Sequence, residues 1–203
     1  GTPNMVTSGV NPELLLAGKY GNSLHVWDLR RRTHLQKLEL GAEQQMALEL
    51  RPAHDPRRSY GFVGVVLSLK DLSSSIWMWH HDEAVGRWKT RKVIEIPAQP
   101  ADPSKLPPLL QGFKAVPPLV TDIDLSLDDR FLYVSCLAGS QVQAWDISNP
   151  ERIRLHDTVQ GIVQANMMHV THDGRRLYVT NSAISSIDYS PRYALRLIQI
   201  GPD

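Results

Sequence analysis

The chain of 203 residues is predicted to be an all-β protein with a β-propeller architecture. A strand–turn–strand pattern occurs three times, at residues 53–63, 126–134 and 170–179. Each copy is followed by a third strand that ends in an apolar or aromatic pair, and a fourth strand closes several of the units. Antiparallel four-stranded units that recur along a chain are typical of propeller blades. We therefore expect about three to four four-stranded blades.

The clearest hairpin lies at residues 170–179. Its Asp173-Gly174 pair is expected to supply the positive backbone dihedrals that a tight turn needs. Leu177 and Tyr178 then begin an apolar and aromatic run that favours a second strand. The same succession of turn and strand predicts hairpins in the two earlier copies, of which the first is the weaker match.

The opening residues, 1–23, are predicted to form a loop and one short helix. Asn11 precedes Pro12, so that a proline falls in the first helical turn, where its missing N–H costs nothing. Gly18 is a suitable stop for this helix, and blade strands are expected to follow from Leu24.

The stretch 97–118 interrupts the blade pattern with seven prolines. This density of proline predicts an extended loop between blades. Residues 1–203 are interpreted as one partial propeller, because this length is short for a closed ring of blades of this size. The remaining blades of a larger ring are therefore expected to be partners of these.

The charges are balanced, with 22 Lys and Arg residues against 21 Asp and Glu residues. This balance gives no reason to expect a nucleic-acid partner, and no apolar run is long enough to predict a membrane span. The single cysteine, Cys136, lies in an apolar strand and is expected to be a buried, inert thiol. A single thiol fits the cytoplasm, and a periplasmic location is the alternative.

Four segments together carry a resemblance to a known family: residues 11–28, 49–64, 121–133 and 174–180. In this order they are similar to the selenium-binding protein family, whose characterised members are methanethiol oxidases. The most specific of them combines Asn11-Pro12 with the Ala-Gly-Lys-Tyr-Gly run at 17–21, because a blade does not require these residues. The resemblance runs over nearly the whole chain and corresponds to the central and C-terminal portion of a family member.

The resemblance implies a propeller of seven blades and a methanethiol oxidase-like oxidoreductase. The implied reaction converts methanethiol, oxygen and water to formaldehyde, hydrogen sulfide and hydrogen peroxide, with a small thiol as substrate. It also implies copper as the metal, with selenium as a further possible ligand, and a place in sulfur metabolism. The long insertion of animal members is missing, which favours a bacterial-type member. The cysteine- and histidine-rich N-terminal segments of the family, and its C-terminal His, Gly-Gly and Asp-Cys motif, are absent as well.

His54 is the leading candidate for a metal ligand. It matches the histidine that the family has before Asn/Asp-Pro, and it lies at an innermost hairpin near one mouth of the central channel. Imidazole is a competent copper ligand. The alternative is a histidine that only bonds the backbone of its turn. His172 occupies the equivalent place in the third copy, but it forms an H-x-x-H pair with His169 that a strand turns to opposite faces.

Glu49, Arg51 and Asp122 lie at matching places on innermost strands, as does Asp124. A carboxylate beside a guanidinium is usually a structural tie, here between blades. The alternative is that these groups orient a metal-bound imidazole by accepting its other N–H.

The enzyme prediction depends on the resemblance, because the sequence has no nucleophile elbow, P-loop or dinucleotide fingerprint. The rival prediction is a non-catalytic propeller that serves as a binding or scaffold platform.

Overall fold

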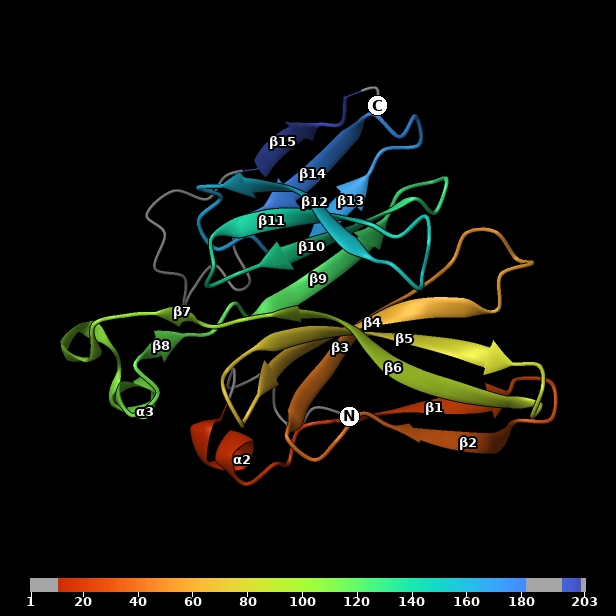
Figure 1. Ribbon diagram of the computed structural model, residues 1–203, viewed down its shortest axis with the longest axis horizontal. Coiled ribbons are helices and arrows are strands. Elements are labelled where there is room, and N and C mark those ends of the chain that lie inside the picture. Colours follow the sequence, from red (N-terminus) through yellow and green to blue (C-terminus); the bar gives the residue numbers. More distant parts are fainter. Residues whose placement is uncertain (1–10, 182–194, 202–203) are drawn as a thin grey trace.

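The computed structural model of the chain describes residues 11–181 and 195–201 (Figure 1). Its strands form successive antiparallel sheets that are the blades of a β-propeller. Blade I contains β3 (Gln44–Pro52), β4 (Tyr60–Ser68), β5 (Ser74–Asp82) and β6 (Arg87–Ile96). Blade II contains β9 (Val120–Leu125), β10 (Phe131–Cys136), β11 (Gln141–Asp146) and β12 (Arg154–Gln160).

Two smaller sheets flank the complete blades. Blade III has β13 (Met168–Val170), β14 (Arg176–Thr180) and β15 (Leu195–Gln199), and a leading pair is formed by β1 (Ser23–Asp28) and β2 (Thr33–Glu39). The propeller prediction is confirmed. Within the described residues, however, two blades are complete, one has three strands and one sheet has two, which is fewer complete blades than the repeats indicated.

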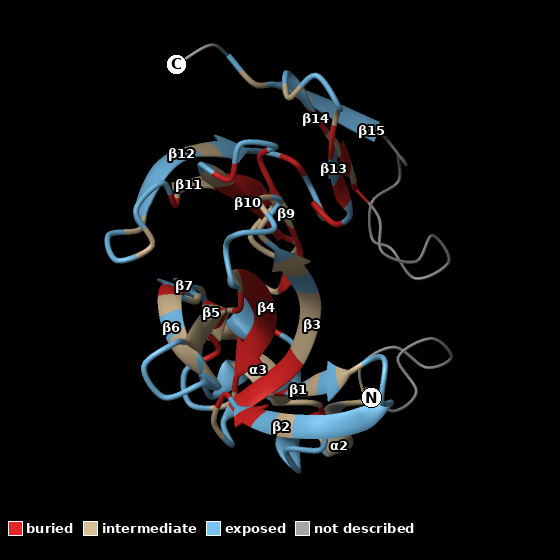
Figure 2. Ribbon diagram, turned by 90° about the vertical axis from the view of Figure 1, so that its right-hand side faces the viewer, coloured by how far each residue is buried: buried red, intermediate tan, exposed pale blue. Residues whose placement is uncertain are grey.

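The innermost strands of the three blades, β3, β9 and β13, are neighbours, and the sheets follow one another around an arc (Figure 2). Burial falls from the second strand outward. In β4, eight of the nine residues are buried, whereas no residue of β12 or β15 is. This gradient is expected when sheets pack face to face near a common axis and their outer strands meet solvent.

The helix α2 (Pro12–Leu16) begins where the sequence predicts. The Asn11 side chain accepts hydrogen bonds from the backbone N–H groups of Glu13 and Leu14, and thereby caps the helix. Gly18, with φ of +64°, follows the C-terminal end. In the described part of the chain, no helix is both long enough and apolar enough to cross a membrane.

The proline-rich connection between blades I and II has a structure of its own. It contains a short ladder of β7 (Gln99–Pro100) with β8 (Ala115–Val116), and between them the 3-10 turn η1 (Pro103–Lys105) and the helix α3 (Pro108–Gln111). Leu106 is buried and Leu110 packs against the cluster that contains Tyr20. The connection is therefore anchored on the body of the molecule.

The hairpins of blades II and III share one turn geometry, whereas the turn of blade I is two residues longer, with the Ala53 N–H donating to the Tyr60 carbonyl. In blades II and III the backbone N–H of the last residue before the turn donates to the carbonyl of the first residue after it, Ser126 to Phe131 and Thr171 to Arg176. Within the Asp173-Gly174 pair, only Gly174 has positive φ, at +70°. Asp129 occupies the corresponding place in blade II with φ of +57°, a conformation that Asp tolerates better than most residues.

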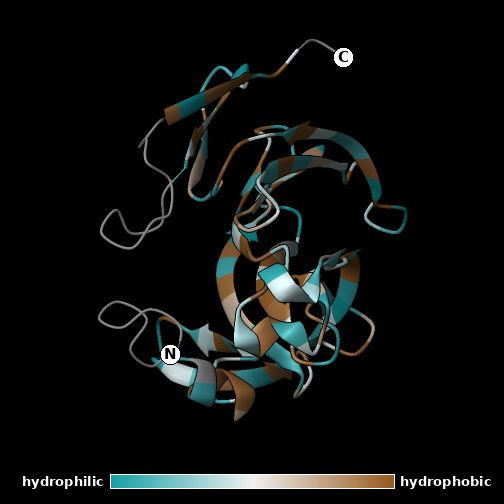
Figure 3. Cartoon of the chain, turned by 90° about the vertical axis from the view of Figure 1, so that its left-hand side faces the viewer, coloured by the Kyte–Doolittle hydropathy of each residue, from teal (hydrophilic) through white to brown (hydrophobic). Residues whose placement is uncertain are grey.

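Hydrophobic cores lie between the blades. One core joins blades I and II through residues such as Phe62, Ile76, Ile123 and Leu132, all fully buried. A second core joins blades II and III around Val179. Figure 3 shows hydrophobic stretches along the strands in the middle of the molecule and hydrophilic stretches at the turns. Removal of apolar area from water at these interfaces is the main stabilisation of such an array.

Candidate functional site

Arg51 on β3 reaches from blade I to blade II. Its guanidinium lies 3.0 Å from Asp122 Oδ1 and 3.7 Å from Asp124 Oδ1, both on β9. The same guanidinium donates to Glu49 Oε2 on its own strand at 2.8 Å. The Asp122 side chain is fully buried, while that of Arg51 is 29% exposed. The structure therefore places Glu49, Arg51 and Asp122 in one ion-pair network that joins two innermost strands.

Asp122 and Asp124 also bond the backbone edges of two blades. Their Oδ1 atoms accept from the next N–H groups on β9, those of Ile123 and Leu125, each at 2.9 Å. Their Oδ2 atoms accept from the N–H groups of Met168 at 2.6 Å and Val170 at 3.0 Å, both on β13. An innermost strand has one edge without a partner strand, and these carboxylates supply the missing acceptors.

Asp122 is the most strongly perturbed acid of this network. Burial raises the pKa of its carboxyl to about 6, against the opposing effects of the Met168 N–H and of Arg51. Glu49 contributes to the increase through like charge. The arrangement fits the structural tie between blades, because every oxygen of Asp122 is bonded to backbone or to Arg51 and none faces a free imidazole.

His54 lies in the turn after β3 and is held by Asp129 of blade II. The Asp129 Oδ1 atom accepts from the His54 backbone N–H at 2.8 Å and contacts His54 Nδ1 at 3.0 Å, and Oδ2 accepts from the Asp55 N–H at 3.0 Å. The Asp129 side chain is 3% exposed and the His54 side chain 45%. Although burial acts against it, the bonds from these two N–H groups hold the pKa of Asp129 below its ordinary value.

This contact orients the imidazole. With Nδ1 next to a carboxylate, the neutral ring carries its proton there and leaves Nε2 as an acceptor. His54 thus has the tautomer that a metal ligand or a proton acceptor requires. The same bonds also serve the alternative prediction, a histidine that stabilises its turn, so the geometry is compatible with both.

The other predicted histidine does not join His54. His172 is exposed in the turn of blade III, and its ring centroid lies 6.4 Å from that of His169 with the two rings nearly perpendicular. Over residues 11–181 and 195–201, no three His, Cys, Asp or Glu side chains are placed to hold one metal ion. The metal role of His54 and His172 therefore stays a prediction.

Cys136 on β10 is buried, as expected. Burial raises the pKa of its thiol to about 12, so that the reactive thiolate is scarce at neutral pH. His80 and His81 lie on β5, and His81 Nδ1 lies 2.9 Å from Glu83 Oε1.

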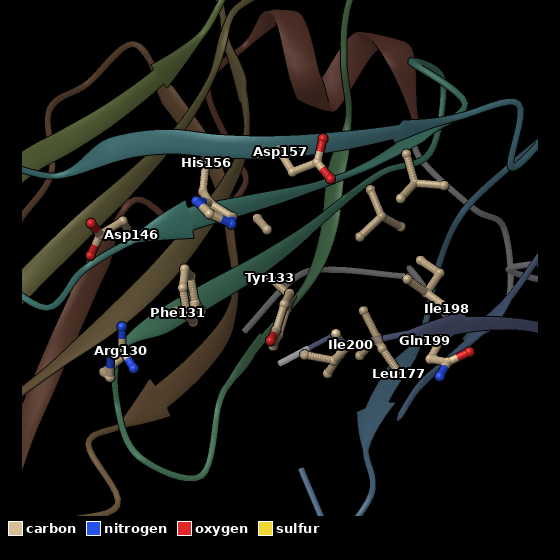
Figure 4. A pocket seen from close by; sticks show the side chains of 14 residues that line it. Arg130, Phe131, Tyr133, Asp146, His156, Asp157, Leu177, Ile198, Gln199 and Ile200 are labelled. Atoms are coloured by element: carbon tan, nitrogen blue, oxygen red, sulfur yellow. The ribbon is translucent and has the colours of Figure 1, made fainter. Parts of the chain in front are cut away.

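A cavity of about 490 Å³ lies between blades II and III, away from the innermost strands. Figure 4 shows Phe131 and Tyr133 from β10 and His156 and Asp157 from β12 on one side, with Ile198 and Ile200 on the other. The rings of Phe131 and His156 are 5.0 Å apart. This volume is within the range of ligand pockets, but none of the predicted site residues lines it.

The sequence did not single out Asp129 or the N–H groups that Asp122 and Asp124 accept. Asp129 is 75 residues from His54, and its role depends on how two blades meet. One signal was present: Asp128-Asp129 stands where the third copy has Asp173-Gly174, and an acidic residue at a position that favours Gly needs a reason.

The fold and the tie between innermost strands define a β-propeller whose blades are joined by side-chain carboxylates near the axis. The fold alone is shared with solved structures of low sequence identity, for example Kuenenia stuttgartiensis hydrazine synthase, with a TM-score of 0.61 at 10% identity, covering 89% of this chain and 52% of that chain.

Closer comparisons identify the family. Residues 1–194 match the family described as 56kDa selenium binding protein (SBP56). The chain is 34% identical to the methanethiol oxidases of Rattus norvegicus and Homo sapiens, over 92% of its length and 43% of theirs. A solved structure of a hypothetical selenium-binding protein from Sulfolobus tokodaii is 48% identical, with a TM-score of 0.82, and the match covers 91% of this chain and 43% of that one.

The chain therefore belongs to the selenium-binding protein family. It spans less than half the length of the curated relatives that it matches.

Proposed function

We propose that the protein containing this chain is a methanethiol oxidase-like oxidoreductase. The observation that carries the proposal is the 34% identity to proteins named methanethiol oxidase over 92% of the chain. The reaction would convert methanethiol, oxygen and water to formaldehyde, hydrogen sulfide and hydrogen peroxide. A small thiol is then the substrate, and the protein belongs to sulfur metabolism in a bacterial-type, cytoplasmic setting.

The residues described here do not by themselves fit a copper site. Copper(II) in proteins takes several nitrogen, oxygen or sulfur ligands, and no group of three His, Cys, Asp or Glu side chains that could hold a metal ion occurs among residues 11–181 and 195–201. Asp129, which contacts the His54 ring, is occupied by two backbone N–H groups and by Nδ1. We propose that His54 is one ligand of copper and that the others come from outside the described residues. Selenium has no candidate here, because Cys136 is buried.

The described residues of this chain orient the His54 ring and hold the innermost strands in place. Asp129 holds the His54 ring through Nδ1, where the turns of blades I and II meet, and the His54 side chain is 45% exposed. Arg51, Asp122 and Asp124 fix the register of the innermost strands on which those turns depend. A misplacement of about 1 Å at a reacting group can cost two orders of magnitude in rate, so this rigidity bears directly on the reaction.

The test uses the full-length protein and its His54→Ala variant. Oxygen-dependent loss of methanethiol, with hydrogen peroxide formed in equal amount, is expected for the unaltered protein. Elemental analysis is expected to find copper near one equivalent, reduced in the variant. A folded full-length protein that consumes no methanethiol would contradict the oxidase proposal.

The rival is a binding platform without catalysis. It is favoured by the absence of a three-ligand group among residues 11–181 and 195–201. A full-length protein that is folded, free of metal and inactive towards methanethiol is the result that this rival predicts.

A further inference from the structure

The interface between blades I and II and the interface between blades II and III differ in how their outer halves are filled. Between blades I and II, the connection from β11 to β12 turns back over blade I, and its Ile147 and Ile153 pack into the shared core. At this place Arg91 on β6 donates from Nη2 to the Pro150 carbonyl and to Glu151 Oε1, both at 2.8 Å. Between blades II and III the corresponding region is the 490 Å³ cavity (Figure 4).

The strand pairings of blades I and II allow the two regions to be compared residue by residue. Phe62 pairs with Met78, which pairs with Arg91; in the next blade Tyr133 pairs with Ala144, which pairs with Asp157. Asp157 therefore stands in blade II where Arg91 stands in blade I.

The apolar wall of the cavity can be compared with blade I through the same strand pairings. Ile76 pairs with Ile94 in blade I, and Val142 pairs with Val159 in blade II, so Val159 corresponds to Ile94. Ile94 is 3% exposed beneath the covering connection, whereas Val159 is 37% exposed in the cavity wall. An apolar position that one interface buries and its counterpart leaves open indicates a surface that is missing its cover.

The hydrogen bonds of Ile147 and Ile200 show from which side a segment could cover the cavity. The Ile147 N–H donates to the Arg130 carbonyl at 2.8 Å, and the Ile200 N–H donates to the Arg175 carbonyl at 2.8 Å. Ile200 thus begins in blade III the connection that Ile147 begins in blade II, and Ile200 and Gly201 already line the cavity.

We propose that this cavity is the docking site for a chain segment that follows residue 203 in a longer protein, and that the segment presents a basic residue to Asp157. The relatives of this chain are longer than it, since the chain spans 43% of their length. The charge at the site is reversed relative to blade I, where a cation on the blade meets Glu151 of the connection. Asp157 has only the Thr158 N–H as a partner among the described residues, so its carboxylate is available.

The inference does not depend on the proposed oxidase function, because it concerns how two blades are closed at their outer side. The cavity, which none of the predicted site residues lines, then has a role. Its occupant is a peptide segment, with an apolar residue over Val159 and a cation at Asp157.

The experiment is thiol labelling of Val159→Cys with iodoacetamide, read by mass spectrometry of the peptide. Cys136 is a silent background, because it is fully buried. The matched control is Glu83→Cys, whose side chain is 82% exposed in the turn after β5. In the full-length protein we expect Val159→Cys to react at least about tenfold more slowly than Glu83→Cys, because labelling requires local opening. In the 203-residue chain the two rates are expected to be similar.

Charge is tested in the same full-length protein. Adding Asp157→Arg to Val159→Cys is expected to raise its labelling rate about tenfold, since two cations then face each other, and adding Glu83→Arg instead is expected to leave it unchanged. Equal labelling of Val159→Cys and Glu83→Cys in the full-length protein would overturn the proposal. Slow labelling of Val159→Cys in the 203-residue chain would overturn it as well. If that protection rises with protein concentration, a second copy covers the cavity; if it does not, the chain itself closes the cavity.

Discussion

The two interfaces between blades use different means at equivalent turns. At the first, Asp129 of blade II accepts hydrogen bonds from the backbone N–H groups of His54 and Asp55 in blade I and also contacts His54 Nδ1. At the second, the same place is Gly174, whose nearest neighbour is an apolar side chain: a Cβ there would come 4.0 Å from Leu127. Within the turn of blade II, Leu127 occupies the position that His54 occupies in the turn of blade I. Polar anchoring at one interface is thus replaced by apolar contact at the next.

The difference shows that the repeat specifies the backbone and leaves the chemistry of each interface free. Both turns need a residue with positive φ, and Asp and Gly each meet that need. Only Asp adds a carboxylate, and only the interface with the carboxylate has an oriented histidine. This is a reason to place the candidate site between blades I and II and not between blades II and III.

The strongest way to break the first interface is Asp122→Ala. The change removes the acceptor of two backbone N–H groups and leaves Arg51 without its buried partner. We expect the free energy of unfolding to fall by about 4 kcal/mol, the range for breaking a buried pair. Urea unfolding measures it, and Glu49→Ala, at a 27% exposed carboxylate, is the control with a loss below about 1 kcal/mol. Equal losses would show that the backbone bonds of Asp122 contribute little.

The cores are compared by truncating one equivalent position in each. Ile94→Ala removes a side chain that is 3% exposed, and we expect a loss of about 3 kcal/mol. Val159→Ala removes one that is 37% exposed beside an existing cavity, and a loss below about 1 kcal/mol is expected. Denaturant midpoints at constant slope give both values. A large loss from Val159→Ala would mean that the second interface is already closed.

The pH dependence of the free energy of unfolding tests the ion-pair network around Asp122. The folded-state pKa of Asp122 is about 6 against an ordinary value of 3.8, so the folded chain binds this proton more tightly than the unfolded chain. The free energy of unfolding therefore decreases as pH rises from about 4 to about 6, by on the order of 2 kcal/mol from this group. The measurement is the difference between the unaltered chain and Asp122→Asn across that range, in which the contributions of other acids cancel. A difference that is constant with pH would contradict the prediction.

The smallest expected effect is at the turn. Asp129→Asn keeps a residue that tolerates positive φ but removes one acceptor, so a loss of about 1 kcal/mol is expected. The more informative measurement is the tautomer of His54, from ring nitrogen and carbon chemical shifts at pH 8. The unaltered chain is expected to carry the proton on Nδ1, and the variant to lose this preference. Retention of the Nδ1–H tautomer in the variant would assign the orientation of His54 to its own turn.

Local patterns predicted the local structure well. The hairpins and the Asn11 cap depend on residues within a few positions of one another, and they are where the sequence placed them. The proline-rich connection contains short strands and helical turns that the prediction of an extended loop did not include. The ion pair of Arg51 was also foreseeable, because a guanidinium and carboxylates at matching places on successive inner strands come together in a propeller. What the sequence did not reveal is the second oxygen of each carboxylate, bonded to the backbone of β13, since a backbone donor leaves no mark in a sequence.

The acceptors on β9 have a consequence for solubility. A strand edge with free N–H groups is a template on which a strand of another molecule can pair, and such pairing leads to aggregation. Asp122 and Asp124 occupy alternate N–H groups along β13, and an incoming strand would have to displace both carboxylates before it could bond there. The inner edge of β13 is thereby protected from strand exchange by two side chains. A variant that lacks both is expected to be limited by aggregation as much as by stability.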